Sequence, residues 1–419
     1  MLSVRVEFSE ENSPSLANAD KTVAMSENRN ILAKLKSNLP WLARYPFVRA
    51  ADFFSKKSDA KKHFIFTVAN HFEPAWKAGG AYDLDTQRRR LDEYHKLARR
   101  TGEAVTDADG TKFRHTNFYP AEQYDFQILE QMAAMQSEGL GEVEIHLHHG
   151  IEKPDTADNL RKSLVEFRDR LAEEHLCLSR FDGAGAPRYA FVHGNLALAN
   201  SAHGKFCGVD DEMQILQETG CYADFTLPSA PEETQVSVIN QIYECALPLT
   251  EKMPHRKGIR ARVFGKQPQL PLIFTGPLVF NWTRRIKGLP VPRLEDGGLT
   301  DNQPSDLKRF RRWQAANITV KNRPEWIFVK LYCHGFFDYD QSACIGEKAQ
   351  RFFSEIVEAG ERTGEYTVHF ASAREAFNIA LAAIDGKTGT PGEFRNYRLQ
   401  TIMSAAQKGL KTQEKATIC

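Results

Sequence analysis

The stretch TNFYPAEQYDFQILEQMAAMQSEGLGEVEIHLHH, residues 116–149, carries the pattern that decides the fold. It begins inside TKFRHTNFYP (residues 111–120), an apolar and aromatic segment that predicts a β-strand. Its middle part, Tyr124–Glu138, places apolar residues roughly on one face of a helix. GEVEIHLHHG (residues 141–150) then predicts a second strand. A strand, a helix and a strand in this order indicate a parallel β-α-β unit.

The same alternation extends over most of the chain. The further predicted strands are HFIFTVAN (63–70), RYAFVHGN (188–195), CYADFTL (221–227), PLIFTGPLVFNW (271–282), EWIFVKLYCHG (325–335) and YTVHFAS (366–372). The further predicted helices are 84–101, Asp155–Glu174, Glu212–Thr219, Glu347–Ala359 and Arg374–Ala383. Strands that alternate with helices in this way predict an α/β fold with a parallel sheet or barrel.

The predicted β/α domain covers residues 61–385 and has irregular segments around and within it. Residues 1–30 are polar and are predicted to form a disordered tail, and residues 386–419 are predicted as a C-terminal tail. Residues 31–60 form an amphipathic basic arm that either packs on the outside of the main domain or docks on an anionic membrane surface or a partner. Residues 248–302, rich in Pro, Gly and basic residues, are predicted as a long inserted loop.

The composition argues against several classes of protein. Lysine and arginine number 55 against 54 acidic residues, so the basic excess typical of nucleic-acid binding is missing. The seven cysteines are scattered without a C-x-x-C pair, which is typical of a reducing compartment. The N-terminus lacks the apolar core of a signal peptide, and no apolar run approaches the roughly 20 residues of a membrane helix. These features predict a cytoplasmic protein without a transmembrane segment.

Polar clusters stand at the carboxyl ends of the predicted strands, which is where α/β barrels hold their active sites. The motif N-H-F-E-P ends the first strand with His71 and Glu73, which face the same direction if the chain stays extended. Strand alternation in E-I-H-L-H-H-G places Glu144, His146 and His148 on one face. Histidines with a carboxylate suit Zn²⁺ or another divalent metal. The pattern therefore predicts a metal or catalytic site, and the alternative is a hydrogen-bonded polar rim.

Five further residues in strands or loops leave two interpretations open. His193 and Asn195 lie in F-V-H-G-N, and Asp224 lies in C-Y-A-D-F-T. His334 ends the apolar segment K-L-Y-C-H-G, where a catalytic imidazole would reach the mouth of a barrel. His255 lies in the long predicted loop. Each of these residues either serves a site or is a structural, hydrogen-bonded side chain.

The order of these clusters resembles the polysaccharide deacetylase superfamily of glycoside hydrolase/deacetylase-type β/α barrels. FIFTVANHFEP stands where that family has a strand ending in T-F-D-D-G, and residues 116–149 follow its T-F-F strand, helix and histidine strand. His146 falls at the first metal histidine, and FVKLYCHG looks like the closing strand, with His334 as its histidine. The resemblance covers about residues 63–385 and implies a distorted (β/α)7-8 TIM-like barrel, with an N-terminal helical arm and a long inserted loop.

The chain departs from the family pattern at three places. Asn70 and His71 occupy the strand end where the family has two aspartates. Gly150 stands at the second metal histidine, so His148 or His149 would have to replace it. The R-P-P-Y motif of the family is missing from the sequence. The fold therefore carries over more directly than the reaction.

The resemblance implies a metal-dependent hydrolase that removes an acetyl or other N- or O-acyl group from a carbohydrate. The implied ligands of the divalent metal, predicted as Zn²⁺, are His71, His146 and His148. Glu73 is the predicted general base with Glu144 second, and His334 would protonate the leaving group or polarise the carbonyl. The predicted substrate-binding residues are Asn70, His149, His193, Asn195, Asp224 and His255.

Two other functions stay open on the sequence. A glycosidase would use two carboxylates, Glu73 with Asp224 or Asp338, about 5 Å apart in a retaining enzyme and roughly 6.5–9.5 Å apart in an inverting one. A non-catalytic carbohydrate-binding protein would account for the missing aspartate pair.

Overall fold

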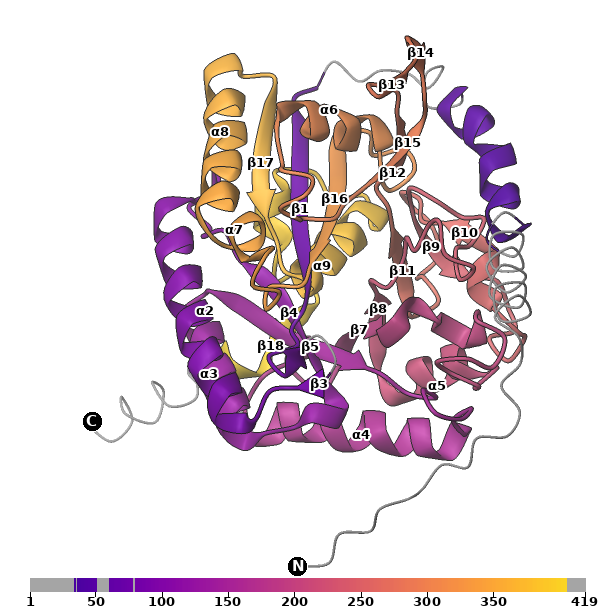
Figure 1. The fold of residues 1–419 in the computed structure, drawn as a ribbon, viewed down its shortest axis with the longest axis vertical. Coiled ribbons are helices and arrows are strands. Elements are labelled where there is room, and N and C mark those ends of the chain that lie inside the picture. The colour runs from indigo at the N-terminus through magenta and orange to yellow at the C-terminus, as the bar shows by residue number, and fades with distance from the viewer. Residues whose placement is uncertain (1–33, 35, 51–59, 78–79, 405–419) are drawn as a thin grey trace, which may run out of the picture.

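The computed structural model describes residues 34, 36–50, 60–77 and 80–404 of the chain. The predicted polar tail 1–30, residues 51–59 of the basic arm and residues 405–419 of the predicted C-terminal tail lie outside the described residues. Within them, one large sheet runs through the molecule, and most of the helices lie along its outer side (Figure 1).

The main sheet has ten strands, and most of them are parallel. Its order is β10-β9-β11-β8-β7-β5-β4-β1-β16, and β17 pairs with β1 as well. Only β9 runs antiparallel to its neighbours β10 and β11. The strands are β1 (Lys62–His71), β4 (His115–Pro120), β5 (Gly141–Leu147), β7 (Tyr189–His193), β8 (Cys221–Asp224), β9 (Gln241–Cys245), β10 (Gly258–Arg260), β11 (Leu272–Thr275), β16 (Trp326–Cys333) and β17 (Tyr366–Phe370).

The predicted α/β class is confirmed, but a TIM-like barrel is not shown. Among the described residues no strand pairing joins β10 to β16, so the sheet is not closed. Instead, β1 is the branch point of the sheet. One edge of β1 pairs with β16, while the other pairs with β17 along Lys62–Phe66 and with β4 from Ala69 to His71. The twist of a long strand allows different neighbours along its two halves.

The helices begin where the sequence offers short polar caps. Asp83, Asp125 and Thr156 each accept a hydrogen bond from a backbone N–H in the first turn of the helix that follows. Ser372 and Glu375 form a capping box. The helices are α2 (Leu84–Ala104), α3 (Phe126–Ser137), α4 (Ala157–Glu173), α5 (Glu212–Thr219), α6 (Leu307–Ala316), α7 (Gln341–Cys344), α8 (Glu347–Thr363) and α9 (Ala373–Ile384).

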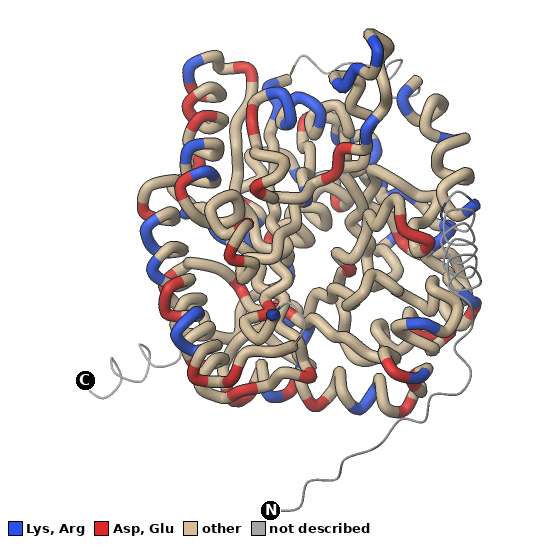
Figure 2. Tube along the Cα trace, in the orientation of Figure 1, with Lys and Arg blue, Asp and Glu red and all other residues tan. Residues whose placement is uncertain are grey.

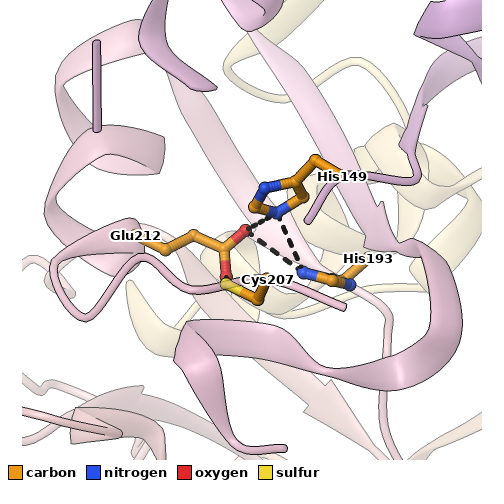
Figure 3. Close-up of side chains that lie close together, drawn as sticks. All are labelled: His149, His193, Cys207 and Glu212. Atoms are coloured by element: carbon orange, nitrogen blue, oxygen red, sulfur yellow. Dashed lines mark hydrogen bonds and ion pairs between the residues drawn. The ribbon is translucent and has the colours of Figure 1, made fainter. Parts of the chain in front are cut away.

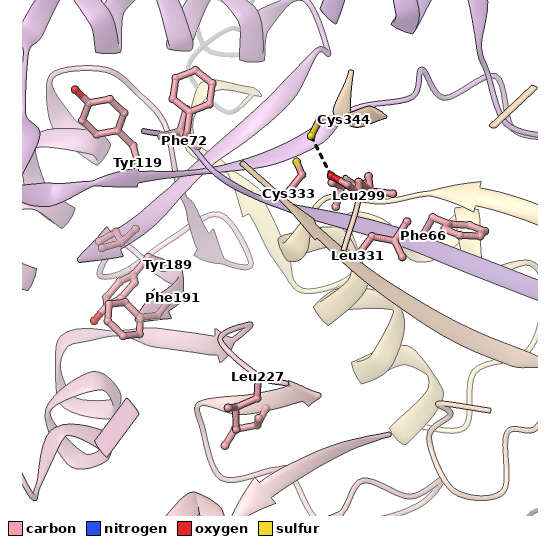
Figure 4. Packing of buried hydrophobic residues seen from close by; sticks show 14 of the residues in the cluster. Phe66, Phe72, Tyr119, Tyr189, Phe191, Leu227, Leu299, Leu331, Cys333 and Cys344 are labelled. Atoms are coloured by element: carbon pink, nitrogen blue, oxygen red, sulfur yellow. Dashed lines mark hydrogen bonds between the residues drawn. The ribbon is translucent and has the colours of Figure 1, made fainter. Parts of the chain in front are cut away.

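Strand alternation sorts the apolar side chains onto two faces of the sheet. On β1, Phe66 and Val68 belong to an outer core that includes residues of α2, α3, α4 and α8 (Figure 4). Ile65 and Ala69 point the other way, into an inner core that contains α9. All residues of α9 are buried, and its alanines let the backbone approach β1, β7 and β8 closely. The inner face is thus covered by one C-terminal helix.

The N-terminal arm packs against the main domain in its described part. Residues 36–50 are helical, and Trp41 is buried against Ile239 and Leu278. The Asn38 side chain donates a hydrogen bond of 2.9 Å to the carbonyl of Pro231. This is the first of the two arrangements predicted for the arm, and it leaves the opposite face of the helix exposed.

Two segments predicted as irregular contain regular structure. The predicted loop 248–302 supplies β10 to the main sheet, beside β11, which lies in the predicted strand 271–282. The predicted tail 386–419 includes a 3-10 helix, Pro391–Phe394, and β18 (Leu399–Thr401), which pairs with β6 (Ser179–Phe181). β10 and β18 have three residues each and carry no readable period, which is why the sequence pattern missed these two strands. The other two-stranded ladders are β2 (Trp76–Lys77) with β3 (Gly80–Ala81), β12 (Leu278–Asn281) with β15 (Arg293–Asp296), and β13 (Arg285–Ile286) with β14 (Leu289–Pro290).

Charges of both signs are spread along the outer helices, as the near-neutral composition predicts (Figure 2). The tip of the β13–β14 hairpin differs, because basic residues stand there without acidic ones. Within the described part of the chain, none of the helices has the length and apolar character that crossing a membrane requires.

Candidate functional site

A cavity of about 550 Å³ opens where several parallel strands end. His71 is the last residue of β1, His148 follows β5 and His334 follows β16, and all three line the cavity. Glu73, two residues beyond β1, lines it as well. Parallel strands bring their carboxyl ends to one edge of a sheet, so residues from distant parts of the chain meet there.

Three side chains converge within this group. Oε1 of Glu73 lies 3.2 Å from Nε2 of His148 and 3.5 Å from Nε2 of His146. One ligand-type atom from each of the three residues lies within 4.8 Å of the others. His146 is fully buried beneath the cavity, whereas Glu73 and His148 reach its wall. The arrangement is a two-histidine, one-carboxylate group at an open surface.

The outer ring nitrogens determine where the protons lie. Nδ1 of His146 is 2.8 Å from the carbonyl oxygen of Val192, and Nδ1 of His148 is 2.7 Å from a carboxylate oxygen of Glu122. These oxygens only accept, so both Nδ1 atoms donate. In the neutral rings both Nε2 atoms then carry lone pairs that face the Glu73 carboxylate. Nε2 of His146 has no hydrogen-bond partner among the described residues. A proton or a metal cation between these atoms would remove the conflict.

The charges of this group reinforce one another. Burial alone would raise the pKa of Glu73, but contacts with His146 and His148 hold it well below its usual value. Burial opposes the charge of His148, yet its hydrogen bonds to Glu122 and Glu73 raise its pKa to about 9. Gly194 allows this ring to fit, because a Cβ at Gly194 would lie 2.3 Å from a carbon atom of the His148 ring.

His71 and His334 form a second pair beside the group. The ring centroid of His71 lies 4.9 Å from that of His146 and 4.6 Å from that of His334. Burial lowers the pKa of His71 well below its usual value, and burial also lowers the pKa of His334. Both rings are therefore neutral near pH 7 and can accept a proton.

The remaining cavity wall offers polar and aromatic surface. Tyr332 donates a hydrogen bond of 2.8 Å to Asp296, and both residues line the cavity together with Asn195. Trp76 and Phe337 pack with ring centroids 3.9 Å apart and also line it. Of the predicted substrate-binding residues, Asn195 is the one that the structure brings to this wall.

His149 and His193, also predicted to bind substrate, lie in a different cluster (Figure 3). Their Nε2 atoms are 3.0 Å apart, and Glu212 Oε1 lies 3.1 Å from Nε2 of His149. Sγ of Cys207 lies 3.6 Å from Oε2 of Glu212. All four side chains are buried and none lines the cavity. Cys207 and Glu212 were not predicted as site residues. The one sequence signal for them is that a cysteine and an acidic residue follow the second of two strands that end in histidines.

Two predicted acidic residues lie deeper than the cavity. Glu144, the predicted second base, accepts hydrogen bonds from Tyr222 and from the N–H of Ala190, and burial raises its pKa to about 8. Asp224 accepts a hydrogen bond of 2.7 Å from Thr226, and burial raises its pKa to about 7. Strand alternation was read correctly for Glu144, but the cavity ends above it, so neither carboxylate lines the wall.

Asn70 and His255 are also away from the cavity wall. Asn70 accepts a hydrogen bond of 2.8 Å from the N–H of Gly335 and donates to Tyr94 at 3.1 Å, so it fastens the segment after β16 to β1. His255 is buried in the 3-10 helix Pro254–Arg256, and burial lowers its pKa to about 3. Both side chains are therefore part of the protein interior and not of the cavity wall.

A third group of potential ligands, Asp107, Asp109 and His369, already has its counter-charge. The Arg395 guanidinium lies 2.6 Å from Asp107 and 3.0 Å from Asp109, and Asp109 also accepts from Nδ1 of His369 at 2.7 Å. These contacts satisfy the carboxylates without a metal.

The comparisons with known proteins add no family. No protein-family model matches the chain, and no curated protein matches it. The resemblance to polysaccharide deacetylases therefore stays a prediction, and the chemistry of the site has to follow from its own residues.

Proposed function

We propose that the cavity is the active site of a metal-dependent hydrolase that removes an acyl group from a carbohydrate. The observation that carries the proposal is the convergence of Glu73, His146 and His148: both Nε2 atoms face the same carboxylate oxygen, while both Nδ1 atoms donate to other partners. Two imidazoles and one carboxylate are the ligand set of catalytic zinc sites that keep a position open for water. The set differs from the sequence prediction, because Glu73 takes the place of His71.

The surroundings of the three residues fit a metal. Val192 and Glu122 hold the outer nitrogens of His146 and His148, as the partners of metal-bound histidines do. Zn²⁺ suits the mixed nitrogen and oxygen donors. When bound, a divalent cation lowers the pKa of a coordinated water and polarises a substrate carbonyl.

The neutral imidazoles beside this group supply proton transfer. We assign this role to His334, which lines the cavity and is stacked on Phe337 with ring centroids 4.5 Å apart. Its ring accepts the proton that the attacking water gives up as the new bond to the acyl carbon forms. It then returns this proton to the leaving nitrogen or oxygen when the acyl bond breaks. One side chain therefore acts first as the general base and then as the general acid. His71 contacts the ring and positions it.

The wall of the cavity favours a carbohydrate. Trp76 and Phe337 present apolar ring surface to the cavity, and Asn195, Asp296 and Tyr332 add hydrogen-bonding groups. A sugar has both kinds of surface, because its C–H bonds and hydroxyl groups lie on different sides of the ring. A site of this kind combines apolar contact with a few directed polar groups.

The test is acetate release from acetylated oligosaccharides, measured together with metal content. We expect His148→Ala to lose the cavity metal and turnover, and His334→Asn to lose turnover while it keeps the metal. Asp338→Asn is the control, because this carboxylate is exposed and pairs with Arg90. Release of reducing sugar that needs Asp338 and survives metal removal would indicate a glycosidase. Oligosaccharide binding without turnover, unchanged by chelator, would indicate a binding protein.

A further inference from the structure

The buried cluster of His149, His193, Cys207 and Glu212 joins four separate parts of the chain. His149 follows β5, His193 ends β7, Cys207 lies in the connection after β7, and Glu212 begins α5. The structure thus brings together two imidazoles, a thiol and a carboxylate, and none of these four residues lines the cavity.

The hydrogen bonds around the cluster leave its inner atoms in conflict. Nδ1 of His149 is 2.9 Å from a carboxylate oxygen of Asp155, and Nδ1 of His193 contacts the carbonyl oxygen of Gly194. Both Nδ1 atoms therefore donate, and both Nε2 atoms carry lone pairs in the neutral rings. These Nε2 atoms lie 3.0 Å apart, and Oε1 of Glu212 lies 3.1 and 3.6 Å from them. One added proton satisfies a single pair of these acceptors, whereas a cation in the centre satisfies them together.

The spacing also matches a tetrahedral ion. Ligands bound to Zn²⁺ at its usual bond lengths lie about 3.3–3.8 Å from one another. The two Nε2 atoms and Glu212 Oε1 lie 3.0–3.6 Å from one another, and Cys207 Sγ lies 3.6 Å from Glu212 Oε2. All four ligand atoms lie within 4.8 Å of one another, so small movements would open the space for the ion. We propose that His149, His193, Cys207 and Glu212 bind Zn²⁺ as a closed, structural site.

The position of this site suggests what it does. Four protein ligands complete a tetrahedral shell, so a structural site of this kind leaves no position for water or substrate. Asp155 and the N–H of Ala199 hold His149 and Glu212 in place. The connection between His193 and Glu212 contains several residues with left-handed backbone, among them Asn195 and Ala199. An ion would fasten this strained connection to the sheet and with it the part of the cavity wall that Asn195 provides.

The test uses the full-length protein and two readouts. We expect about two metal equivalents per chain in the wild type, with His148→Ala and Cys207→Ala each losing a different one. Replacing the metal by Co²⁺ should produce a thiolate-to-cobalt absorption band, which His148→Ala keeps and Cys207→Ala loses. If Cys207→Ala does not fold, the presence or absence of the absorption band in the wild type and in His148→Ala still tests the proposal. Absence of the band, or full metal content in folded Cys207→Ala, would overturn the proposal and leave that of the cavity metal untouched.

A different observation concerns the β13–β14 hairpin. Residues 282–293 contain four cations and no acidic residue, and Trp282, Ile286 and Leu289 are exposed there by 57%, 47% and 70%. These apolar side chains are exposed beside basic residues, and no other part of the described chain covers them. Four positive charges fit a surface of negative charge, and the apolar side chains fit a layer beneath it.

The N-terminal helix extends this surface. Tyr45 packs on Phe280 with ring centroids 4.9 Å apart, and Phe280 packs on Trp282 at 6.0 Å. On the other side of the helix, Phe47 is 76% exposed, and Arg44 is exposed beside it. We infer that the hairpin and this helix bind the headgroup region of an anionic bilayer.

Vesicle co-sedimentation tests this inference, with vesicles of phosphatidylcholine alone and with phosphatidylglycerol added. The double variant Arg284→Gln/Lys287→Gln should bind the anionic vesicles roughly twenty-five-fold more weakly, since each cation contributes roughly five-fold. Ile286→Ser/Leu289→Ser should also lose binding, whereas Phe126→Ser, exposed on α3 at the far end of the molecule in Figure 1, should not. Equal binding to both vesicle types would refute an anionic bilayer as the partner. Self-association of the wild type that the hairpin variants lose would refute it as well, in favour of a second copy of the chain.

Discussion

Two neighbouring residues, His148 and His149, serve two different clusters. His148 turns toward an open cavity and meets Glu73, whereas His149 turns into the closed interior and meets His193 and Glu212. The proton arrangement is the same in both, because each outer nitrogen donates to a carboxylate. Access to solvent is what differs. The comparison teaches that similar side chains suit a catalytic site where water can enter, and a structural site where it cannot.

The largest expected effect separates the two clusters by turnover. Glu73→Gln removes a carboxylate at the open site, so acetate release should fall by about 10²–10⁴-fold. The unfolding midpoint should change less than in a Glu212→Gln variant, because Glu73 reaches the cavity wall, whereas Glu212 is fully buried. Steady-state kinetics and thermal unfolding of the same preparation measure both quantities. Unchanged turnover in this variant would mean that the open cluster is not catalytic.

The closed cluster should respond in stability instead. Glu212→Gln leaves buried imidazoles without their charged partner, and we expect a loss of roughly 3–5 kcal/mol in the free energy of unfolding. Urea denaturation measures this loss. Glu218→Gln on the same helix is the control, because its partner Arg161 is solvent-accessible and the pair should contribute less than about 1 kcal/mol. Equal effects of both variants would break the contrast between open and closed sites.

The outer partners should act on their own cluster alone. Glu122→Gln weakens the support of His148, and Asp155→Asn weakens that of His149. Each should lower metal affinity by about 10–100-fold at one site and leave the other unchanged. Competition with a chromogenic chelator resolves the two affinities. A loss at both sites in either variant would indicate one coupled site rather than two.

The last expected effect is a slope with pH rather than a single step, and it concerns the other wall of the cavity, which a lysine supports. Lys330 donates to the carbonyl oxygens of Phe225 and Leu227, and burial lowers its pKa to about 7. At pH values between about 7 and 10.5, Lys330 is protonated in the unfolded chain and has released its proton in the folded chain. Folding stability from this residue therefore rises with pH across that range, by at most about 1.4 kcal/mol per pH unit. The difference in unfolding free energy between wild type and Lys330→Met, measured from pH 7 to 10, should show this slope, and a flat difference would contradict it.

The sequence predicted the fold best where periodicity was strong. Glu212–Thr219 was predicted at the bounds of α5, and the strands that became β1, β5 and β16 were each identified within a few residues. Whether the sheet closes depends on strand pairing between distant residues, which no local pattern contains. The α/β class could thus be predicted, while the branching of the sheet at β1 could not.

The site was predictable in its residue types and less so in its grouping. His71, Glu73, His148 and His334 were all expected at one edge, and they line one cavity. Alternation separated His148 from His149 but could not place the His149 side chain, because the chain leaves the strand after Leu147. The pairing of His149 with Cys207 and Glu212 depends on a connection without periodic structure. Tertiary arrangement alone reveals such a cluster.

The complete burial of α9 has a consequence for how the protein is made. The inner face of β1, β7 and β8 is covered by residues 373–384, which leave the ribosome after all three of these strands. Until then this face exposes Ile65, Ala190 and Val192 to water or to other nascent chains. Synthesis must therefore pass α9 before this face of the sheet is covered, and a polypeptide that stops before α9 would be a substrate for chaperones and proteases.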